Sequence, residues 1–239
     1  MRRCAVVTGI ASGMGKYIAE KLSEKDFLVF GADIKNVELP NVKSHKVDVS
    51  DEKQVHKFIE IIKNETDRID CLINVAGILC DKERNRIENL SSKEWKKVLE
   101  VNLDSVFYMS KYSIPMLKKS NNASIVNFSS DQVYKAKNKS APYAISKAAV
   151  EMFTKICARE LICDSIRANT IALASVETNF IKNLDIDEYK YQEMIKTADE
   201  KMPFGIIKVE DVWDLIEYLI KDNCKITGQT ILVDSGTLL

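Results

Sequence analysis

Short apolar segments rich in β-branched residues alternate along the chain with longer amphipathic stretches. Strands that alternate with helices form βαβ units, in which the strands run parallel and helices cover both faces of the sheet. The expected strands are Arg3–Thr8, Leu28–Asp33, His45–Val49, Asp70–Val75, Ser124–Phe128, Arg167–Ala172 and Thr230–Val233. The pattern therefore predicts a doubly wound α/β fold with a mostly parallel, seven-stranded sheet.

Helical periodicity fills the longer intervals between these strands. The expected helices are Met14–Lys25, Glu52–Asn64, Ser92–Lys119, Pro142–Cys163 and Val209–Lys221. Ser91 and Glu94 form a capping box before the third helix, and Pro142 lies in the first turn of the fourth. Residues 178–205 are polar and irregular, which is typical of an insertion that covers a cleft as a lid. We expect residues 1–239 to form one domain.

Charge and cysteine usage exclude several classes of protein. The 239 residues include 35 Lys and Arg against 35 Asp and Glu, so no basic surplus favours nucleic acid or an anionic membrane. The N-terminus has no signal-peptide core, and no apolar stretch approaches the ~20 residues of a membrane span. The six cysteines and two histidines show no spacing typical of a metal site. We therefore expect a cytoplasmic protein without a metal, a nucleic-acid partner or a membrane contact.

A glycine-rich loop lies between the first expected strand and the first expected helix. Gly9 permits a tight turn off the strand, whereas Gly13 and Gly15 allow close approach of a pyrophosphate and close packing of the helix on the sheet. The N–H groups at the helix start, around Ser12 and Met14, attract phosphate. A glycine loop alone is a weak indication, but this one opens a βαβ unit, as in a Rossmann dinucleotide-binding fold.

Asp33 ends the second expected strand, about 20 residues beyond the loop. A carboxylate at this position accepts hydrogen bonds from the adenosine ribose hydroxyls and repels a 2′-phosphate. Neither Ala11 nor Ile34 supplies a compensating cation, although Lys35 works in the opposite direction. The sequence therefore predicts NAD rather than NADP as the cofactor.

Tyr143 and Lys147 are four residues apart in a helical pattern, so their side chains share one face. Ser130 precedes Tyr143 by thirteen positions and follows a buried strand, which puts it at the carboxyl edge of the sheet. Doubly wound folds bind their ligands at that edge. Ser129 is an alternative to Ser130, but the spacing favours Ser130.

These motifs occur together and in a fixed order. They are Thr8-Gly9-x-x-x-Gly13-x-Gly15, Asp48-Val49, Asn74-x-Ala76-Gly77, Asn102, Ser130, Tyr143-x-x-x-Lys147 and Ile226-Thr227-Gly228-Gln229. With them the chain resembles the short-chain dehydrogenase/reductase family over essentially its whole length. The resemblance implies an oxidoreductase that moves a hydride between a nicotinamide cofactor and a carbonyl or secondary alcohol carbon.

The resemblance also implies a role for each motif residue. Tyr143 would be the general acid in reduction and the base in oxidation, although an unperturbed tyrosine has a pKa of about 10. Lys147 would favour the phenolate and hold the nicotinamide ribose. Ser130 would bind the substrate oxygen, and Asn102 would hold a water that passes protons to Lys147. Further cofactor contacts are implied for Asp48, Val49, Asn74, Ala76, Gly77, Val176 and Thr178.

The chain departs from the family pattern at three places. Val75 replaces the second asparagine of Asn-Asn-Ala-Gly, and Ser235 replaces a glycine near the C-terminus. Leu173-Ala174 replaces the usual Pro-Gly beside the nicotinamide. Leucine frees a backbone angle that proline would fix, and alanine adds a methyl group where glycine allows close approach. This last change puts the shape of the nicotinamide pocket in doubt.

Two other functions compete with an NAD-dependent dehydrogenase. One is a 3-oxoacyl-carrier-protein reductase that uses NADP(H), although Asp164 stands where such enzymes have a docking arginine. The other is a non-catalytic NAD-binding redox sensor. The small-molecule substrate stays open among a sugar or polyol, a hydroxy acid, a steroid and a hydroxyacyl thioester, with Gln132 and Tyr134 among the side chains that would select it.

Two of the expected helices, Ser92–Lys119 and Pro142–Cys163, carry apolar residues on more than one face. One face of each should pack on the sheet. The lid or a crossing loop would be one cover for the other faces, whereas the resemblance implies that they build a homodimer or homotetramer through a two-fold interface.

Overall fold

The computed structural model describes residues 2–79, 85–178 and 188–239. Their strands form one seven-stranded sheet, in the order β3-β2-β1-β4-β5-β6-β7, and every pairing between neighbours is parallel. The strands are β1 (Cys4–Thr8), β2 (Leu28–Asp33), β3 (Val42–Lys46), β4 (Cys71–Asn74), β5 (Ser124–Ser130), β6 (Arg167–Leu173) and β7 (Thr230–Val233). The predicted doubly wound fold is confirmed.

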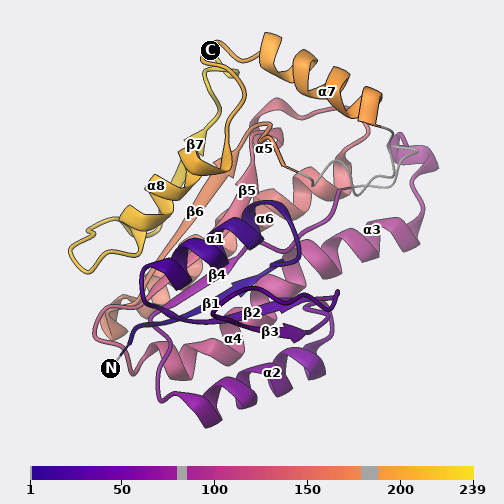
Figure 1. The fold of residues 1–239 in the computed structure, drawn as a ribbon. Helices are drawn as coiled ribbons and strands as arrows, with labels where there is room; N and C mark the ends of the chain where they lie inside the picture. Colours follow the sequence, from indigo (N-terminus) through magenta and orange to yellow (C-terminus); the bar gives the residue numbers. More distant parts are fainter. Residues whose placement is uncertain (1, 80–84, 179–187) are drawn as a thin grey trace.

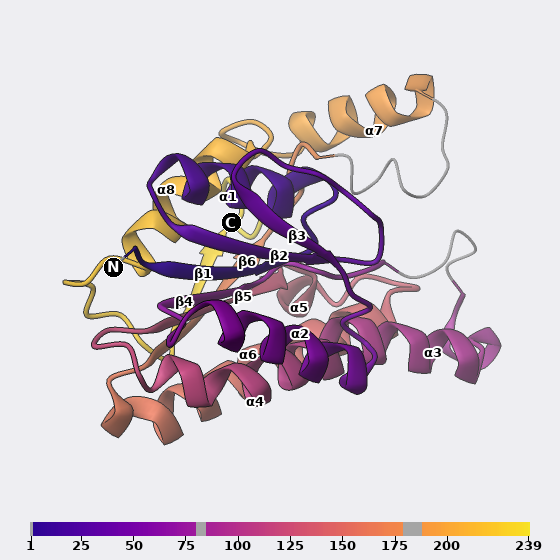
Figure 2. The same cartoon turned by 60° about the horizontal axis from the view of Figure 1, so that its bottom comes forward.

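Helices cover both faces of the sheet, and each face has its own apolar core (Figures 1 and 2). Helices α1 (Gly13–Glu24) and α8 (Val209–Leu219) pack on one face. The other face carries α2 (Glu52–Glu65), α4 (Ser105–Leu117) and α6 (Ala141–Leu161). The described residues also form α3 (Ser92–Leu99), α5 (Gln132–Lys135), α7 (Glu188–Glu200) and the short turns η1 (Ile87–Asn89), η2 (Glu100–Asp104) and η3 (Ile162–Asp164).

The strand order reverses at the gap between β1 and β4. The chain runs outward from β1 to β3 on one side of this gap, and from β4 to β7 on the other. At such a point the two loops that leave the strands diverge, and the gap between their carboxyl ends receives the ligand. The glycine loop follows β1, and residues 75–79 follow β4. The topology therefore puts the predicted cofactor loop beside the Asn-x-Ala-Gly motif.

The third strand differs from the prediction. We expected His45–Val49, whereas β3 pairs with β2 from Val42 to Lys46. The side chains of Val47 and Val49 are buried, but they pack in the core from the loop after the strand. The alternation of apolar residues at 47 and 49 indicates that these side chains are buried, and it does not indicate that they pair in a strand. Because β3 is the edge of the sheet, its own sequence is largely polar.

The predicted helix Ser92–Lys119 is interrupted. It consists of α3 and α4, joined by the π-helical turn η2, in which the N–H of Ser105 donates to the carbonyl of Glu100. A π-turn inserts one residue into the helix and frequently marks a functional site. Asn102 lies in this turn and is fully buried.

Several further differences lie close to the carboxyl edge of the sheet. Strands β5 and β6 each continue beyond the expected end, to Ser130 and Leu173, because these two residues pair with each other. Helix α5 was not expected. The predicted lid, residues 178–205, includes α7, and its part from 179 to 187 lies outside the described residues. None of the described helices has the length and apolar character to cross a membrane.

Candidate active site

The glycine loop fits closely against two neighbouring segments. Gly9 and Gly13 both have positive φ, which favours glycine. A side chain on Gly9 would lie 3.1 Å from the Cα of Ala76, and one on Gly13 would lie 3.3 Å from the Cβ of Thr178. A methyl group on Gly15 would overlap the carbonyl oxygen of Gly9. The structure thus brings the loop against the predicted cofactor residues that follow β4 and β6.

The first turn of α1 presents unpaired donors at this loop. Ser12 occupies the N-cap position, but its side chain caps no N–H group, and the first turn contains no acidic residue. Uncapped N–H groups at a helix start bind phosphate oxygens. Met14 follows in the first turn and packs on the core beneath α1. The chemistry of this turn fits the pyrophosphate of a dinucleotide.

Asp33 ends β2 beside the same loop. One carboxylate oxygen accepts the N–H of Ala11 at 2.9 Å, and the other accepts the N–H of Lys35 at 3.0 Å. Each carboxylate oxygen has two acceptor sites, so a ribose hydroxyl can still donate to either one. Asp33 therefore shapes the loop and also fits the adenosine ribose.

Thr8 was part of the glycine motif but was not predicted to have a role of its own. Its hydroxyl accepts the N–H groups of Val75 at 3.0 Å and Ala76 at 3.1 Å. The segment after β4 is thereby tied to the end of β1. The unusual Val75 packs against the core beneath α1, so the missing second asparagine leaves this backbone anchor in place.

Two residues with predicted cofactor contacts, Asn74 and Val49, have buried side chains. The amide of Asn74 donates to Asn127 across the sheet at 2.8 Å and is buried, so only its backbone can reach a cofactor. Val49 is 5% exposed and belongs to the core between the sheet and α2. Asp48 accepts from the N–H and hydroxyl of Ser50 and is partly exposed. Val176 is held by a parallel bridge to Ile207.

The predicted catalytic residues meet at the carboxyl end of β5. The ammonium of Lys147 donates to the carbonyl of Phe128, two residues before Ser130, at 2.9 Å. It lies 5.9 Å from the centre of the Tyr143 ring. Ser129 instead turns toward α6, where its hydroxyl lies 2.7 Å from the carboxylate of Glu151. The hydroxyl of Ser130 instead contacts Asp131 and the backbone N–H of Gln132, at the carboxyl end of β5.

Asn102 joins the segment after β4 to α6. Its side-chain oxygen accepts the N–H of Ile78, and its amide group donates to the carbonyl of Ile78 and the hydroxyl of Ser146. Both amide hydrogens are therefore used, so a water held for Lys147 would need a backbone carbonyl of Asn102 or its turn. A methyl group on Gly77 would lie 3.2 Å from the Asn102 oxygen and 3.5 Å from the Lys147 ammonium. Ser146 is a further residue of the site that the sequence did not single out.

The replacement of Pro-Gly by Leu173-Ala174 extends the sheet. Leu173 pairs with both Ser130 and Val233, and the N–H of Ala174 donates to the carbonyl of Val233 at 3.1 Å. The carbonyl of Leu173 accepts the N–H of Asp131. The segment that leads to Thr178 is thus held by backbone hydrogen bonds in place of a fixed proline.

Burial lowers the pKa of Lys147 from 10.5 to about 8, because the ammonium is removed from water. Between about pH 8 and 10.5 the unfolded chain binds a proton that the folded protein has released. The free energy of unfolding should therefore rise with pH across this window, by ~3 kcal/mol for a difference of about 2.5 units.

Lys147→Met should lose this pH dependence. Denaturant unfolding of both proteins without cofactor, at pH 7 and pH 10.5, checks the expectation. Wild type should gain stability relative to Lys147→Met as the pH rises. A constant difference between the two proteins would contradict the lowered pKa.

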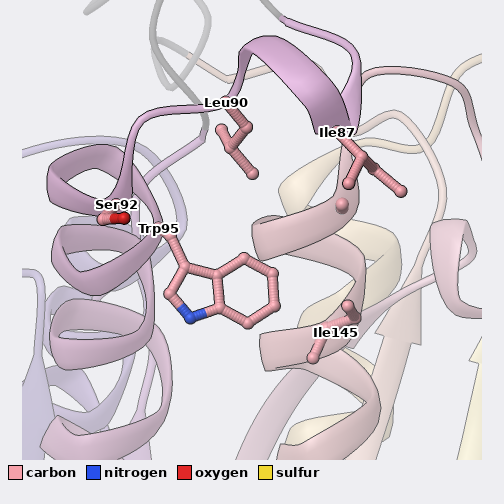
Figure 3. Close-up of a pocket in the computed structure, with 6 residues that line it drawn as sticks. Ile87, Leu90, Ser92, Trp95 and Ile145 are labelled. Atoms are coloured by element: carbon pink, nitrogen blue, oxygen red, sulfur yellow. The ribbon is translucent and has the colours of Figure 1, made fainter.

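An apolar groove lies between the start of α3 and the start of α6 (Figure 3). Its cavity of about 370 Å³ is lined by Ile87, Leu90, Ser92, Trp95, Ala141 and Ile145. The indole of Trp95 points across the gap toward Ile145. At 100° per residue, Ala141 and Ile145 lie on the side of α6 away from Tyr143, so the groove is separate from the reacting centre.

Comparison with known proteins identifies the family. A family model described as enoyl-(acyl carrier protein) reductase matches residues 9–237. The chain is also 33% identical, over 245 residues, to a 3-oxoacyl-[acyl-carrier-protein] reductase of Buchnera aphidicola, covering 98% of this chain and 97% of that one. The chain belongs to the short-chain dehydrogenase/reductase family.

Solved structures of this family share the fold. The ligand-free aldohexose dehydrogenase of Thermoplasma acidophilum matches with a TM-score of 0.92 and 28% identity, over 99% of this chain and 94% of that one. ElxO with NADP bound matches with a TM-score of 0.88 and 25% identity, over 100% and 99% of the two chains. The short-chain dehydrogenase/reductase family binds nicotinamide cofactors, and this member is accordingly an oxidoreductase.

Proposed function

We propose that the protein transfers a hydride between NAD(H) and a carbonyl or secondary alcohol carbon. The observation that carries this proposal is the convergence of Ser130, Lys147 and Asn102 at the carboxyl end of β5, with Tyr143 beside Lys147. The same edge of the sheet presents the glycine loop and Asp33. A bound nicotinamide supplies or accepts the hydride.

The side chains of the site perform the proton chemistry. In reduction, the hydroxyl of Tyr143 donates a proton to the substrate oxygen, and in oxidation its phenolate takes that proton back. A hydrogen bond from Ser130 orients the same oxygen. The buried ammonium of Lys147 stabilises the phenolate, because opposite charges attract strongly where water is excluded. Asn102 fixes the segment after β4 against α6, which keeps Lys147 in place.

The choice of NAD over NADP rests on Asp33. Its carboxylate lies beside the glycine loop, residues 9–15, which contains no Lys or Arg, and Lys35, two residues beyond Asp33, is exposed. ElxO, a protein of similar fold, has been solved with NADP bound, and kinetics with both cofactors distinguish NAD from NADP for this chain.

A second candidate is the NADP(H)-dependent 3-oxoacyl-carrier-protein reductase, because a relative carries that name. Asp164 argues against it. This aspartate forms an ion pair with Lys118 at 2.9 Å, so the position offers a carboxylate rather than a free cation to an acidic carrier. The non-catalytic sensor lacks support, since none of the four predicted catalytic residues has been lost.

Steady-state kinetics with NADH and NADPH, across a panel of ketones and aldehydes, test the proposal. We expect turnover with NADH. Turnover with NADPH alone and a 3-oxoacyl thioester would favour the second candidate, and binding of NADH without any turnover would favour the sensor.

We also propose that residues 1–239 act as one domain that assembles into a homodimer or homotetramer. Large apolar side chains are exposed on the outer faces of α4 and α6: Phe107 is 43% exposed, Met152 58% and Ile156 46%. Phe107 contacts Phe153 edge to face, which joins the two helices into one surface. Ile145 continues this surface into the groove of Figure 3. Burial of this apolar surface against the same surface of a second copy would form an isologous interface.

Light scattering at tens of micromolar should give a multiple of the 27.1 kDa chain mass. Met152→Glu should shift the mass toward one chain, because it places a charge in the apolar contact. Ile61→Glu, an exposed apolar position on α2, serves as the control and should leave the mass unchanged. A monomeric wild type would reject the interface.

A further inference from the structure

The side chain of Gln132 links the two segments that carry the predicted catalytic residues. Its backbone N–H donates to the hydroxyl of Ser130 at 3.3 Å. Its side-chain oxygen accepts the hydroxyl of Ser140, which lies three residues before Tyr143. Gln132 therefore spans the gap between the serine and the tyrosine that would hold the reacting oxygen.

The hydroxyl of Ser140 is available for this task because of the way α6 begins. Ser140 is the N-cap residue, and an N-cap serine ordinarily accepts an N–H group of the first turn. Here it makes no such bond, and Pro142 in that turn has no N–H to offer. Ser140 is 3% exposed, so its hydroxyl holds the amide of Gln132 in a protected position.

An amide whose oxygen is occupied still has two N–H donors. No other described residue accepts a hydrogen bond from the side-chain nitrogen of Gln132, and the residue is only half buried. This nitrogen and the oxygen bound to Ser140 belong to the same amide group, so the nitrogen also lies in the gap between Ser130 and Tyr143. Gln132 thus offers donors next to the place where the reacting carbon would lie.

The charges around Gln132 favour a neutral substrate group over a carboxylate. The carboxylate of Asp131 lies 3.3 Å from the hydroxyl of Ser130 and is almost fully buried. The nearby ammonium of Lys135 is occupied, because it binds Asp131 at 2.6 Å and the hydroxyl of Thr237 at 2.9 Å. This ion pair therefore offers no net positive charge to a substrate carboxylate.

We infer that Gln132 is a specificity-determining residue that recognises a neutral oxygen on the carbon next to the reacting carbon. The substrate class is then a vicinal diol in oxidation and an α-hydroxy ketone in reduction, as in polyols and sugars. This inference rests on the proposed function, since it names the substrate of the same site.

Acetoin and 2-butanone provide a matched pair of substrates, because they differ only by the hydroxyl beside the ketone. Wild type should reduce acetoin with a kcat/KM about tenfold or more above that for 2-butanone, which corresponds to one net hydrogen bond. Pyruvate, which carries a carboxylate in the same place, should be poorer than acetoin.

Gln132→Leu should bring the ratio of acetoin to 2-butanone to within about twofold, because leucine is close in size and has no side-chain N–H donor. Ser140→Ala should reduce the ratio partly, because it releases the amide. Gln229→Leu is the matched control and should leave the ratio unchanged, since Gln229 is exposed before the start of β7 and its side chain donates to the carbonyl of Thr227.

Equal use of the two ketones by wild type, or an unchanged ratio in Gln132→Leu, would overturn the inference. In both cases turnover itself would leave the proposed function standing. If acetoin were inert while other carbonyl compounds were reduced, only the inference would fail. If no carbonyl compound were reduced with either cofactor, both would fail.

Discussion

Replacing Tyr143 with phenylalanine is expected to lower kcat by about 10²–10⁴-fold while leaving NADH affinity nearly unchanged. Phenylalanine retains the ring, which is 8% exposed and packs with Val98, and deletes only the hydroxyl that moves the proton. Lys147 still donates to the carbonyl of Phe128, so the cofactor side of the site should stay intact. Single-turnover kinetics and fluorescence titration of NADH separate the two effects.

Ser129→Ala is a control for the loss of a hydroxyl group close to the site, and Ser130→Ala is the substitution with which it is compared. Ser129 precedes Ser130 in β5, but its hydroxyl faces Glu151 rather than the cleft, so its loss should affect kcat far less than the loss of the Ser130 hydroxyl. If Tyr143→Phe retained more than about a tenth of the wild-type kcat, Tyr143 would not be the general acid.

Wild type is expected to prefer NAD to NADP by at least about a hundredfold in kcat/KM. With NAD, the carboxylate of Asp33 gains charge-assisted hydrogen bonds from the ribose, worth roughly 1.5–3 kcal/mol. With NADP it loses them and meets a phosphate, and two unit charges ~4 Å apart repel by about 4 kcal/mol at an effective dielectric near 20. Solvent exposure reduces this repulsion, but ~3 kcal/mol in total already gives a hundredfold preference.

Asp33→Asn tests the charge most cleanly. Asparagine preserves an oxygen that can accept the N–H of Ala11, so the glycine loop should keep its shape, while the repulsion and the bond from the N–H of Lys35 disappear. The ratio of NAD to NADP use should fall at least tenfold. Lys35→Gln should raise the ratio only slightly, because an exposed cation contributes little. If wild type used both cofactors equally, the carrier-protein reductase would become the leading function.

The fold was predictable because strands buried on both faces have a distinctive sequence. The apolar runs of β1, β2 and β4 are continuous, and each is followed by a recognisable turn or helix. The prediction of β3 was wrong because an edge strand has no such signature, whereas the buried loop valines at 47 and 49 imitate one. Local apolar periodicity indicates burial, and it does not distinguish a strand from a loop that packs on the core.

The break in the long helix had a different cause. The helical pattern of residues 92–119 is uninterrupted, and the π-turn at Glu100–Asp104 is fixed by a tertiary contact of Asn102 with the backbone of Ile78. A contact between residues 24 positions apart leaves no trace in local propensity. The bridge between Gln132 and Ser140 was missed for the same reason, although Gln132 had been singled out as a substrate residue.

The predicted site residues came from ordered motifs, and the structure brings most of them to one edge of the sheet. The exceptions, the side chains of Asn74 and Val49, are buried among neighbours of the core. A motif identifies a position, but it does not say whether the side chain or the backbone of that position serves the ligand.

Transfer of a label from the cofactor tests the central claim most directly. NADH dideuterated at C4 of the nicotinamide is incubated with the protein and a ketone that it reduces, and the alcohol is analysed by mass spectrometry. We predict one deuterium on the carbinol carbon with wild type, and about 10²–10⁴-fold slower labelling with Tyr143→Phe. Alcohol formed without deuterium at that carbon, or NADH bound without any reduction across the ketone panel, would contradict hydride transfer at this site.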